Sequence, residues 1–192
     1  MNKVDRAFEL FDAYNKQDPQ TIVHEGVSYP AEFFYALQLY YWVIKLQPAA
    51  SEPLLLASRC QHIGRWEIDR KNYPAGKAGY YKWRTDLAKF HAEKAAHLLL
   101  EAGYTIEETE PVQRIVRKEG LRTDPDVQTM ENALCLVFLQ FQYKDFIRDH
   151  DDEKVMRIVK KSWAKMTSPG REAAATLVFN GREKELLEKA LS

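Results

Sequence analysis

Apolar residues recur every three or four positions along most of this chain, a spacing that predicts amphipathic helices. Proline and glycine divide the pattern into segments. Pro30, Pro53 and Pro125 fall at expected first helical turns, and Gly103 falls just after an expected helix end. The pattern predicts helices over residues 3–16, 32–46, 54–67, 80–102, 107–118, 126–146, 151–166, 171–179 and 182–191.

The segments between these helices lack the signals of β-strands. There is no sustained alternation of apolar and polar residues and no Asn-Gly or Asp-Gly turn. Residues 20–29 are predicted to be a short polar connection, residues 69–79 an ordered loop, and residues 168–170 a break. The run 133–139 is apolar on every side, which is typical of a helix at the centre of a bundle. The sequence predicts one all-α domain over residues 1–192, built as a multi-helix bundle.

Composition and charge narrow the class of protein. The 28 Lys and Arg residues balance 28 Asp and Glu residues, so no net charge attracts nucleic acid or an anionic membrane. The longest apolar run is too short to span a bilayer, and the charged, amphipathic beginning does not look like a signal peptide. Cys60 and Cys135 lie far apart in apolar surroundings, which is typical of buried, reduced thiols. We therefore expect a cytoplasmic protein.

Functional side chains are densest in residues 54–70, directly behind an apolar run. Arg59, His62 and Trp66 lie on one helical face, next to the face expected to enter the core. Guanidinium groups suit phosphate or carboxylate ligands, so Arg59, Arg65 and Arg70 are candidate anion-binding residues. The alternative for each arginine is a structural or surface ion pair. For His62 the alternatives are metal ligation, acid–base chemistry or a structural hydrogen bond.

Four titratable residues on different predicted helices are expected to point inward. His91 lies on an apolar stripe, and Glu32 and Glu131 each stand at the entry of a strongly apolar helix. A buried carboxylate is costly unless it is paired or coordinated. Together with His62, these residues form a set that can hold a divalent metal ion.

No Walker loop, GxGxxG, HExxH or CxxC motif is present. From the segment QHIGRWEIDR onward, however, the chain resembles the family catalogued as domain of unknown function 4202. It departs from the pattern of that family at Asp69, where proline is usual, at Asn132, where aspartate is usual, and in a looser basic pair at residues 117–119. The matching residues are Gln61, His62, Ile63, Arg65, Trp66, Ile68, Arg70, Tyr73, Pro74, Gly79, Tyr80, Trp83, Arg84, Phe90, His91, Ala92, Leu121, Glu131, residues 135–139, Lys161, Trp163, Lys165 and Met166.

The order of these motifs also resembles that of HD-domain phosphohydrolases, an all-α superfamily that arranges histidines and aspartates around a metal. Residues 61–64 fall where His-Asp-Ile-Gly would stand, without the literal His-Asp pair. This resemblance implies a divalent metal held by His62, His91 and Glu131. It implies catalytic roles for Glu32, His62 and His91. The substrate-binding residues would be Arg59, Arg65, Trp66, Arg70, Arg84 and Lys118.

Two functions remain open from the sequence. The first is an HD-like, metal-dependent hydrolase of a phosphoester or nucleotide. The second is a non-catalytic binding protein on a degenerate HD-like fold, recognising a small anionic ligand or a protein partner. The absence of the His-Asp pair motivates this alternative. The substrate, the metal and the oligomeric state are not determined by the sequence.

Overall fold

The computed structural model describes residues 2–192, and within them the regular secondary structure is helical apart from one short hairpin. The all-α prediction is therefore confirmed. The helices are α1 (Lys3–Asn15), α2 (Ala31–Leu46), α3 (Glu52–Cys60), α4 (Gly76–Glu101), α5 (Ile106–Arg117), α6 (Pro125–Val137), α7 (Tyr143–Asp149), α8 (Asp152–Lys165), α9 (Ser168–Ala174) and α10 (Gly181–Leu191).

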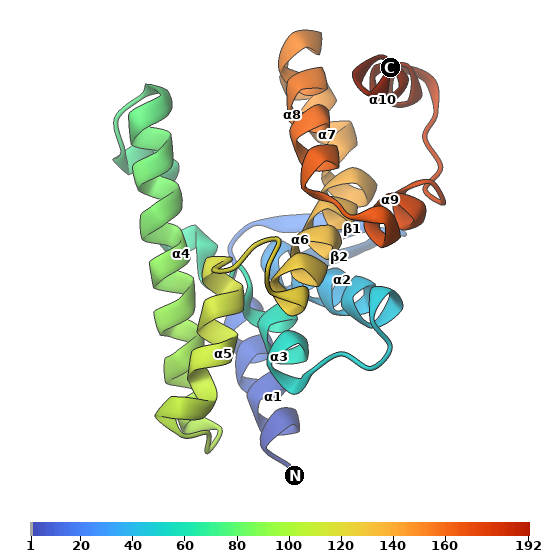
Figure 1. The fold of residues 1–192 in the computed structure, drawn as a ribbon. Coiled ribbons are helices and arrows are strands. Elements are labelled where there is room, and N and C mark those ends of the chain that lie inside the picture. The colour runs from blue at the N-terminus through green and yellow to red at the C-terminus, as the bar shows by residue number, and fades with distance from the viewer. Residues whose placement is uncertain (1) are drawn as a thin grey trace.

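The helices form two flanks joined by a central group (Figure 1). The long α4 packs along α5 on one flank, and α8 packs with α10 on the other. Between them, α2 packs against α3 and α6. This arrangement brings the ends of α3 and α5 and the first half of α4 to one region, where the candidate site lies.

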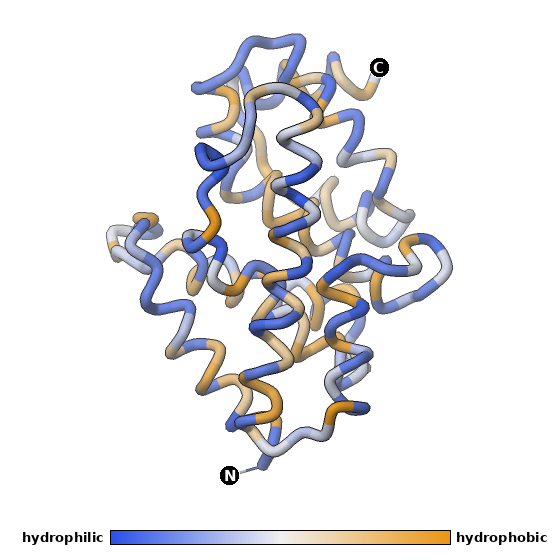
Figure 2. The backbone as a smooth tube through the Cα atoms, turned by 90° about the vertical axis from the view of Figure 1, so that its left-hand side faces the viewer, coloured by the Kyte–Doolittle hydropathy of each residue, from blue (hydrophilic) through white to orange (hydrophobic). Residues whose placement is uncertain are grey.

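One continuous apolar cluster draws on nearly every helix. Leu54, Ile63, Met130 and Leu136 are completely buried within it. In Figure 2 hydrophobic stretches run through the middle of the molecule, whereas the outer loops are mostly hydrophilic. Cys60 and Cys135 are both buried and unbonded to each other, as predicted. None of the helices described in residues 2–192 has the length and apolar character needed to cross a membrane.

The predicted polar connection at residues 20–29 is instead a β-hairpin. Strand β1 (Thr21–His24) pairs antiparallel with β2 (Val27–Pro30). The turn residues Glu25 and Gly26 both have positive φ, 50° and 79°, as a type I′ turn requires. The prediction failed because glutamate, which disfavours that conformation, stands where Asn or Asp is usual. Glycine at the second turn position, Gly26, is sufficient for the turn to form here.

The helix predicted over residues 54–67 ends at Cys60. After a short turn, Gly64 adopts a left-handed conformation with φ of 68° and begins the 3-10 turn η1 (Arg65–Glu67). A Cβ at Gly64 would lie 2.6 Å from the Glu67 carboxylate and 2.8 Å from the Phe90 ring. Glycine therefore lets the chain turn sharply at this point. As a result, His62 and Arg65 lie at the edge of a cavity and are not held in a straight helix.

The loop predicted at residues 69–79 is shorter than expected. It contains the 3-10 turn η2 (Arg70–Asn72), and α4 already begins at Gly76. The first turn of α4 closes tightly on the loop, because a Cβ at Gly79 would lie 1.9 Å from the Pro74 carbonyl oxygen. This contact fixes how the N-terminal half of α4 approaches the site.

Two further boundaries differ in the C-terminal half. The helix predicted over residues 126–146 is helical throughout, but a π-helical turn, η3 (Phe138–Gln142), separates α6 from α7. The predicted break at residues 168–170 is the start of α9, because Pro169 is tolerated in a first helical turn. The helix predicted over residues 171–179 therefore starts earlier, at Ser168, and it also ends earlier, at Ala174.

Candidate functional site

Two cavities meet at a shared wall made by His62, Arg65 and Arg84. We call the first the basic compartment, with a volume of about 540 Å³, and the second the mixed compartment, with a volume of about 580 Å³. The basic compartment is lined by Gln61, His62, Arg65, Tyr81, Arg84, Thr85, Leu87, Ala88, Lys89, His91, Val116, Arg117 and Lys118. The mixed compartment is lined by Asp18, Gln20, Ala31, Glu32, Tyr35, His62, Arg65, Trp66, Ile68, Asp69, Arg70, Lys71, Trp83, Arg84 and Gln142.

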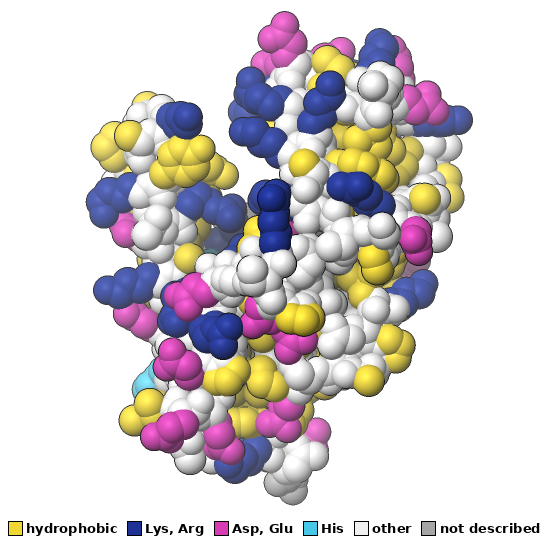
Figure 3. All heavy atoms as spheres, in the orientation of Figure 1, with side chains coloured by type: hydrophobic (Ala, Val, Ile, Leu, Met, Phe, Trp, Pro, Cys, Tyr) yellow, Lys and Arg dark blue, Asp and Glu magenta, His cyan; other side chains and the backbone are white. Residues whose placement is uncertain are grey.

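The lining of the basic compartment has one sign of charge. It includes Arg65, Arg84, Lys89, Arg117 and Lys118, and none of the described residues that line it is Asp or Glu. A concave surface of one charge focuses its field and attracts ions of the opposite sign. Figure 3 shows a hollow between the upper part of α4 and α8, with Lys and Arg side chains on both sides.

The two arginines of the shared wall differ in their surroundings. The Arg65 guanidinium lies 5.3 Å from the centre of the Trp83 ring, and its Nε lies 3.8 Å from a Glu32 carboxylate oxygen. That distance is too long for a hydrogen bond. Arg84 is exposed, and within residues 2–192 its guanidinium has neither a hydrogen bond nor an ion pair. Both groups therefore keep donors available for a ligand.

His62 and His91 lie close together beside these arginines, with ring centres 5.8 Å apart. Burial holds the pKa of His62 well below its usual value, and the positive charge of Arg65 lowers that pKa further. Burial likewise lowers the pKa of His91 to about 4. Both rings are therefore neutral near pH 7, and each presents one donor and one acceptor nitrogen.

Two polar side chains in the basic compartment are buried with one atom unpaired. His91 is 3% exposed, and its Nδ1 lies 2.7 Å from the Ile63 carbonyl oxygen. Gln61 is also 3% exposed, and its amide nitrogen donates to the Val116 carbonyl at 3.0 Å. Nε2 of His91 and Oε1 of Gln61 have no hydrogen-bond partner among the described residues. Unsatisfied buried groups of this kind are uncommon in folded proteins.

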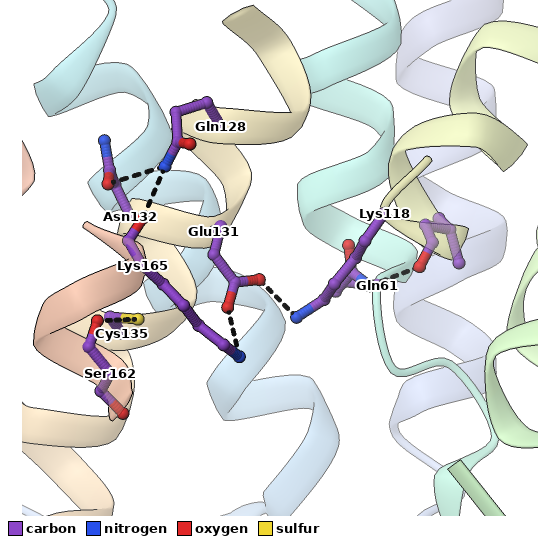
Figure 4. A network of polar contacts seen from close by, with 9 residues as sticks. Gln61, Lys118, Gln128, Glu131, Asn132, Cys135, Ser162 and Lys165 are labelled. Atoms are coloured by element: carbon purple, nitrogen blue, oxygen red, sulfur yellow. Dashed lines mark hydrogen bonds and ion pairs between the residues drawn. The ribbon is translucent and has the colours of Figure 1, made fainter. Parts of the chain in front are cut away.

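Glu131 is tied into an ion-pair network that reaches the basic compartment (Figure 4). Its carboxylate accepts from Lys118 at 2.6 Å and from Lys165 at 2.9 Å. Burial alone would raise the pKa of Glu131, but the two ammonium groups outweigh it and hold the pKa below its usual value. Burial lowers the pKa of Lys118, and Glu131 offsets only part of that effect. Glu131 therefore positions Lys118, whose side chain lines the cavity.

Glu32 lies across the shared wall, in the mixed compartment, and its side chain is 11% exposed. Burial raises its pKa to about 7, against the lowering effect of Arg65. Its backbone N–H donates to Asp18 at 2.9 Å, which anchors the first turn of α2. A carboxyl group whose pKa is near neutrality in a cavity is a candidate acid–base group.

Three of the predicted substrate-binding residues have other partners. Arg59 pairs with Asp12, and its guanidinium also lies over the rings of Phe8 and Tyr40. Arg70 donates to the carbonyls of the loop that precedes α4. Trp66 packs against Tyr14 with ring centres 5.9 Å apart. Arg70 and Trp66 still line the mixed compartment, whereas Arg59 lines neither compartment.

The structure brings His62 and His91 together but does not add Glu131 to them as a third metal ligand. Among residues 2–192 no group of three His, Cys, Asp or Glu side chains is arranged to hold a metal ion. Glu131 binds two lysines, while His62 and His91 stand beside arginines. A cationic environment opposes a divalent cation, so the donor set does not fit the metal that the HD resemblance implies.

Asn132, which stands where the family pattern has aspartate, has a structural role here. Its side-chain nitrogen donates to the Thr167 hydroxyl at 2.8 Å, and its oxygen accepts from the Thr167 backbone N–H at 3.1 Å. It therefore holds the start of α9. Its side chain also lies so close to Gly170 that a Cβ there would come within 2.7 Å.

Sequence reasoning missed Gln61, Lys89 and Arg117 as lining residues. Lys89 and Arg117 resemble any exposed basic residue on a helix, so no local signal marks them. Gln61 did carry a signal: it is a polar side chain between Cys60 and His62, at a position that continues the apolar face. A buried amide needs partners and so merits attention when candidate sites are sought.

Comparison with known proteins gives a family without an assigned activity. No curated protein matches the chain, and no solved structure matches it. The profile of the family described as "Domain of unknown function (DUF4202)" matches residues 5–187. That match covers both compartments and nearly every helix, and we conclude that the chain belongs to the DUF4202 family.

Proposed function

We propose that this protein binds a small anionic ligand in the basic compartment, with Arg65, Arg84 and Lys118 as its main contacts. One observation carries the proposal: five cationic side chains and no carboxylate line that cavity among the described residues. Like charges gathered in one place repel each other. Such a cluster is stabilised when an anion neutralises it.

The size and chemistry of the cavity support a small-molecule ligand. A volume of about 540 Å³ falls within the usual range for such sites. The chain as a whole has no net charge, so attraction to an anion arises locally. Two guanidinium groups on the shared wall favour a planar or tetrahedral oxyanion, because each can donate two parallel hydrogen bonds. Phosphate and carboxylate groups meet this requirement.

Thermal denaturation against a panel of anions tests the proposal, since a ligand that binds only the folded state raises the melting temperature. The panel contains inorganic phosphate, phosphate esters and dicarboxylates, each at matched ionic strength. Arg84→Gln removes a free guanidinium without leaving an ion-pair partner behind, and we expect it to weaken binding on the order of tenfold. Arg157→Gln is the matched control, because Arg157 is exposed on α8 and lines neither compartment.

A shift in melting temperature that Arg84→Gln reduces and Arg157→Gln leaves intact supports the site. The proposal fails if no anion shifts the wild-type transition. It fails equally if both variants respond like the wild type, because the anion then acts elsewhere or through general salt effects.

Phosphoester hydrolysis on an HD-like fold in the cytoplasm is a second candidate, favoured by Glu32. Its carboxyl group, with a pKa of about 7, lies across the arginine wall from the proposed anion site. A group with such a pKa can take a proton from an attacking water near neutral pH. In this account Glu32→Gln lowers kcat by about 10²–10⁴-fold and leaves anion binding intact. Failure of the wild type to hydrolyse any phosphoester that binds would exclude this candidate and leave the binding function standing.

A further inference from the structure

Two residues that line the basic compartment each carry a hydrogen-bond acceptor without a partner, and an anion alone does not explain these acceptors. They are Nε2 of His91 and Oε1 of Gln61, and both are buried without a partner among the described residues. Simple anions offer only acceptors, so they would leave these two atoms unpaired. A buried acceptor without a partner destabilises the folded state, because it has lost its hydrogen bonds to water.

The chemical identity of both atoms follows from their neighbours. The Ile63 carbonyl can only accept, so Nδ1 of His91 must carry the proton and Nε2 must carry the lone pair. The Val116 carbonyl likewise requires the amide nitrogen of Gln61, which leaves its oxygen unpaired. The low pKa of His91, about 4, keeps Nε2 unprotonated near neutral pH.

The neighbouring cations do not satisfy these acceptors. Lys118 donates to Glu131 at 2.6 Å. Arg65 stands over Trp83 and faces Glu32. The compartment therefore combines two kinds of group: positively charged side chains that attract an anion, and neutral acceptors that lack a hydrogen-bond donor.

We propose that the ligand of the basic compartment is an oxyanion that brings its own hydrogen-bond donor, read by His91 and Gln61. This inference rests on the anion-binding function proposed above and narrows it. Two sources supply the chemistry: hydrogen phosphate, whose P–OH group donates, and a phosphate ester with a neighbouring hydroxyl group. Sulfate has similar shape and charge but no proton near neutral pH, so this site discriminates against it.

Calorimetric titration at pH 7 with four probes tests the inference and separates the two sources. Inorganic phosphate is compared with sulfate, and glycerol phosphate with methyl phosphate, so that each pair differs mainly in a donor. A site that leaves buried polar groups unpaired rejects the analogue that lacks the donor. We expect at least one pair to differ on the order of tenfold in Kd. A preference for phosphate assigns the donor to the oxyanion, and a preference for glycerol phosphate assigns it to the hydroxyl.

Two variants connect the preference to the two acceptors. Gln61→Met and His91→Phe each keep a side chain of similar size and remove an acceptor, together with the donor to the Val116 or Ile63 carbonyl. We expect the preference of each variant, measured as the ratio of the two Kd values, to fall below about threefold. His97→Phe, at an exposed position of the same helix α4, is the control and should retain the preference.

The possible outcomes separate the two proposals. If the probes bind but neither pair differs in the wild type, the donor-reading inference is wrong and the anion site stands. If a preference exists and survives both Gln61→Met and His91→Phe, the inference is also wrong. If no probe binds to the wild type, the anion-binding function itself fails. The wild-type comparison needs no variant to fold, so the inference is tested even if one of them does not.

Discussion

At the scale of the residue, Arg59, Arg65 and Arg84 look equivalent in sequence and have different roles in the structure. Arg65 and Arg84 present donors to both compartments. Arg59, only a few positions away, pairs with Asp12, 47 residues earlier in the chain. Local sequence indicates that guanidinium groups gather near residue 60, but it cannot indicate which of them meets a carboxylate. That depends on how α1 packs against α3.

His62, His91, Glu32 and Glu131 were correctly predicted to lie on inward-facing positions, but the groups they meet were not. A buried carboxylate must be paired or coordinated, and the HD resemblance implied a metal ion for Glu131. Lys118 and Lys165 provide the charge. They approach from the end of α5 and from α8, two places that no pattern along α6 can identify.

Glu131→Gln should destabilise the protein strongly. It leaves Lys118 and Lys165 facing a neutral amide, and breaking a buried pair typically costs about 3–5 kcal/mol. Because Lys165 is about half exposed, we expect a loss of about 3 kcal/mol in the free energy of unfolding. Urea denaturation measures it. Asp145→Asn, in an exposed pair with Arg148, is the control and should change stability little. An equal effect of both substitutions would contradict a structural role for the Glu131 network.

Glu32 should make stability depend on pH in a direction opposite to most carboxylates. Its pKa rises from 4.5 to about 7 on folding, so the folded state holds a proton that the unfolded state has lost. This contribution to stability is complete below pH 4.5 and declines as the pH rises through 7. Urea denaturation measures the free energy of unfolding of wild type and Glu32→Gln. Between pH 4.5 and 8 the wild type should lose up to roughly 3 kcal/mol relative to the variant. A pH-independent difference would show that the carboxyl titrates normally.

At the scale of the element, the periodic pattern predicted helices well and their interruptions poorly. The apolar spacing continues through residues 61–66, although α3 ends at Cys60. Gly64 determines where the helix ends. It adopts a positive φ, and its missing Cβ leaves room for the side chains of Glu67 and Phe90. A single glycine inside an apolar pattern is tolerated in many helices. Its effect here depends on Phe90, which approaches from α4.

The contact between Gly79 and the Pro74 carbonyl should hold α4 and the loop before it in the positions that shape the mixed compartment and its shared wall. Gly79→Ala places a methyl group 1.9 Å from that oxygen, so the loop or the first turn of α4 must move. We expect a loss of about 2 kcal/mol in the free energy of unfolding and weaker anion binding, because Arg84 lies on the displaced part of α4. Ala78→Ser, at the exposed neighbouring position, is the control. Unchanged stability in Gly79→Ala would mean that the loop is not fixed by this contact.

At the scale of the whole molecule, the all-α class followed from the spacing of apolar residues, whereas the candidate site did not. The basic compartment gathers residues from the end of α3, the first half of α4 and the end of α5. Their meeting depends on α4 packing along α5, which is a long-range contact. The balanced net charge of the sequence conceals the cluster, because carboxylates such as Glu119 and Glu131 pair with these cations from outside the cavity lining.

Diffraction from crystals grown with inorganic phosphate, at a concentration that saturates binding in solution, would show where the anion binds. The account predicts tetrahedral density in the basic compartment, within hydrogen-bond distance of Arg84 and of at least one of Arg65 and Lys118. It further predicts that the same density is lost in Arg84→Gln crystals. An empty compartment under these conditions, or phosphate found only on exposed lysines outside it, would contradict the account.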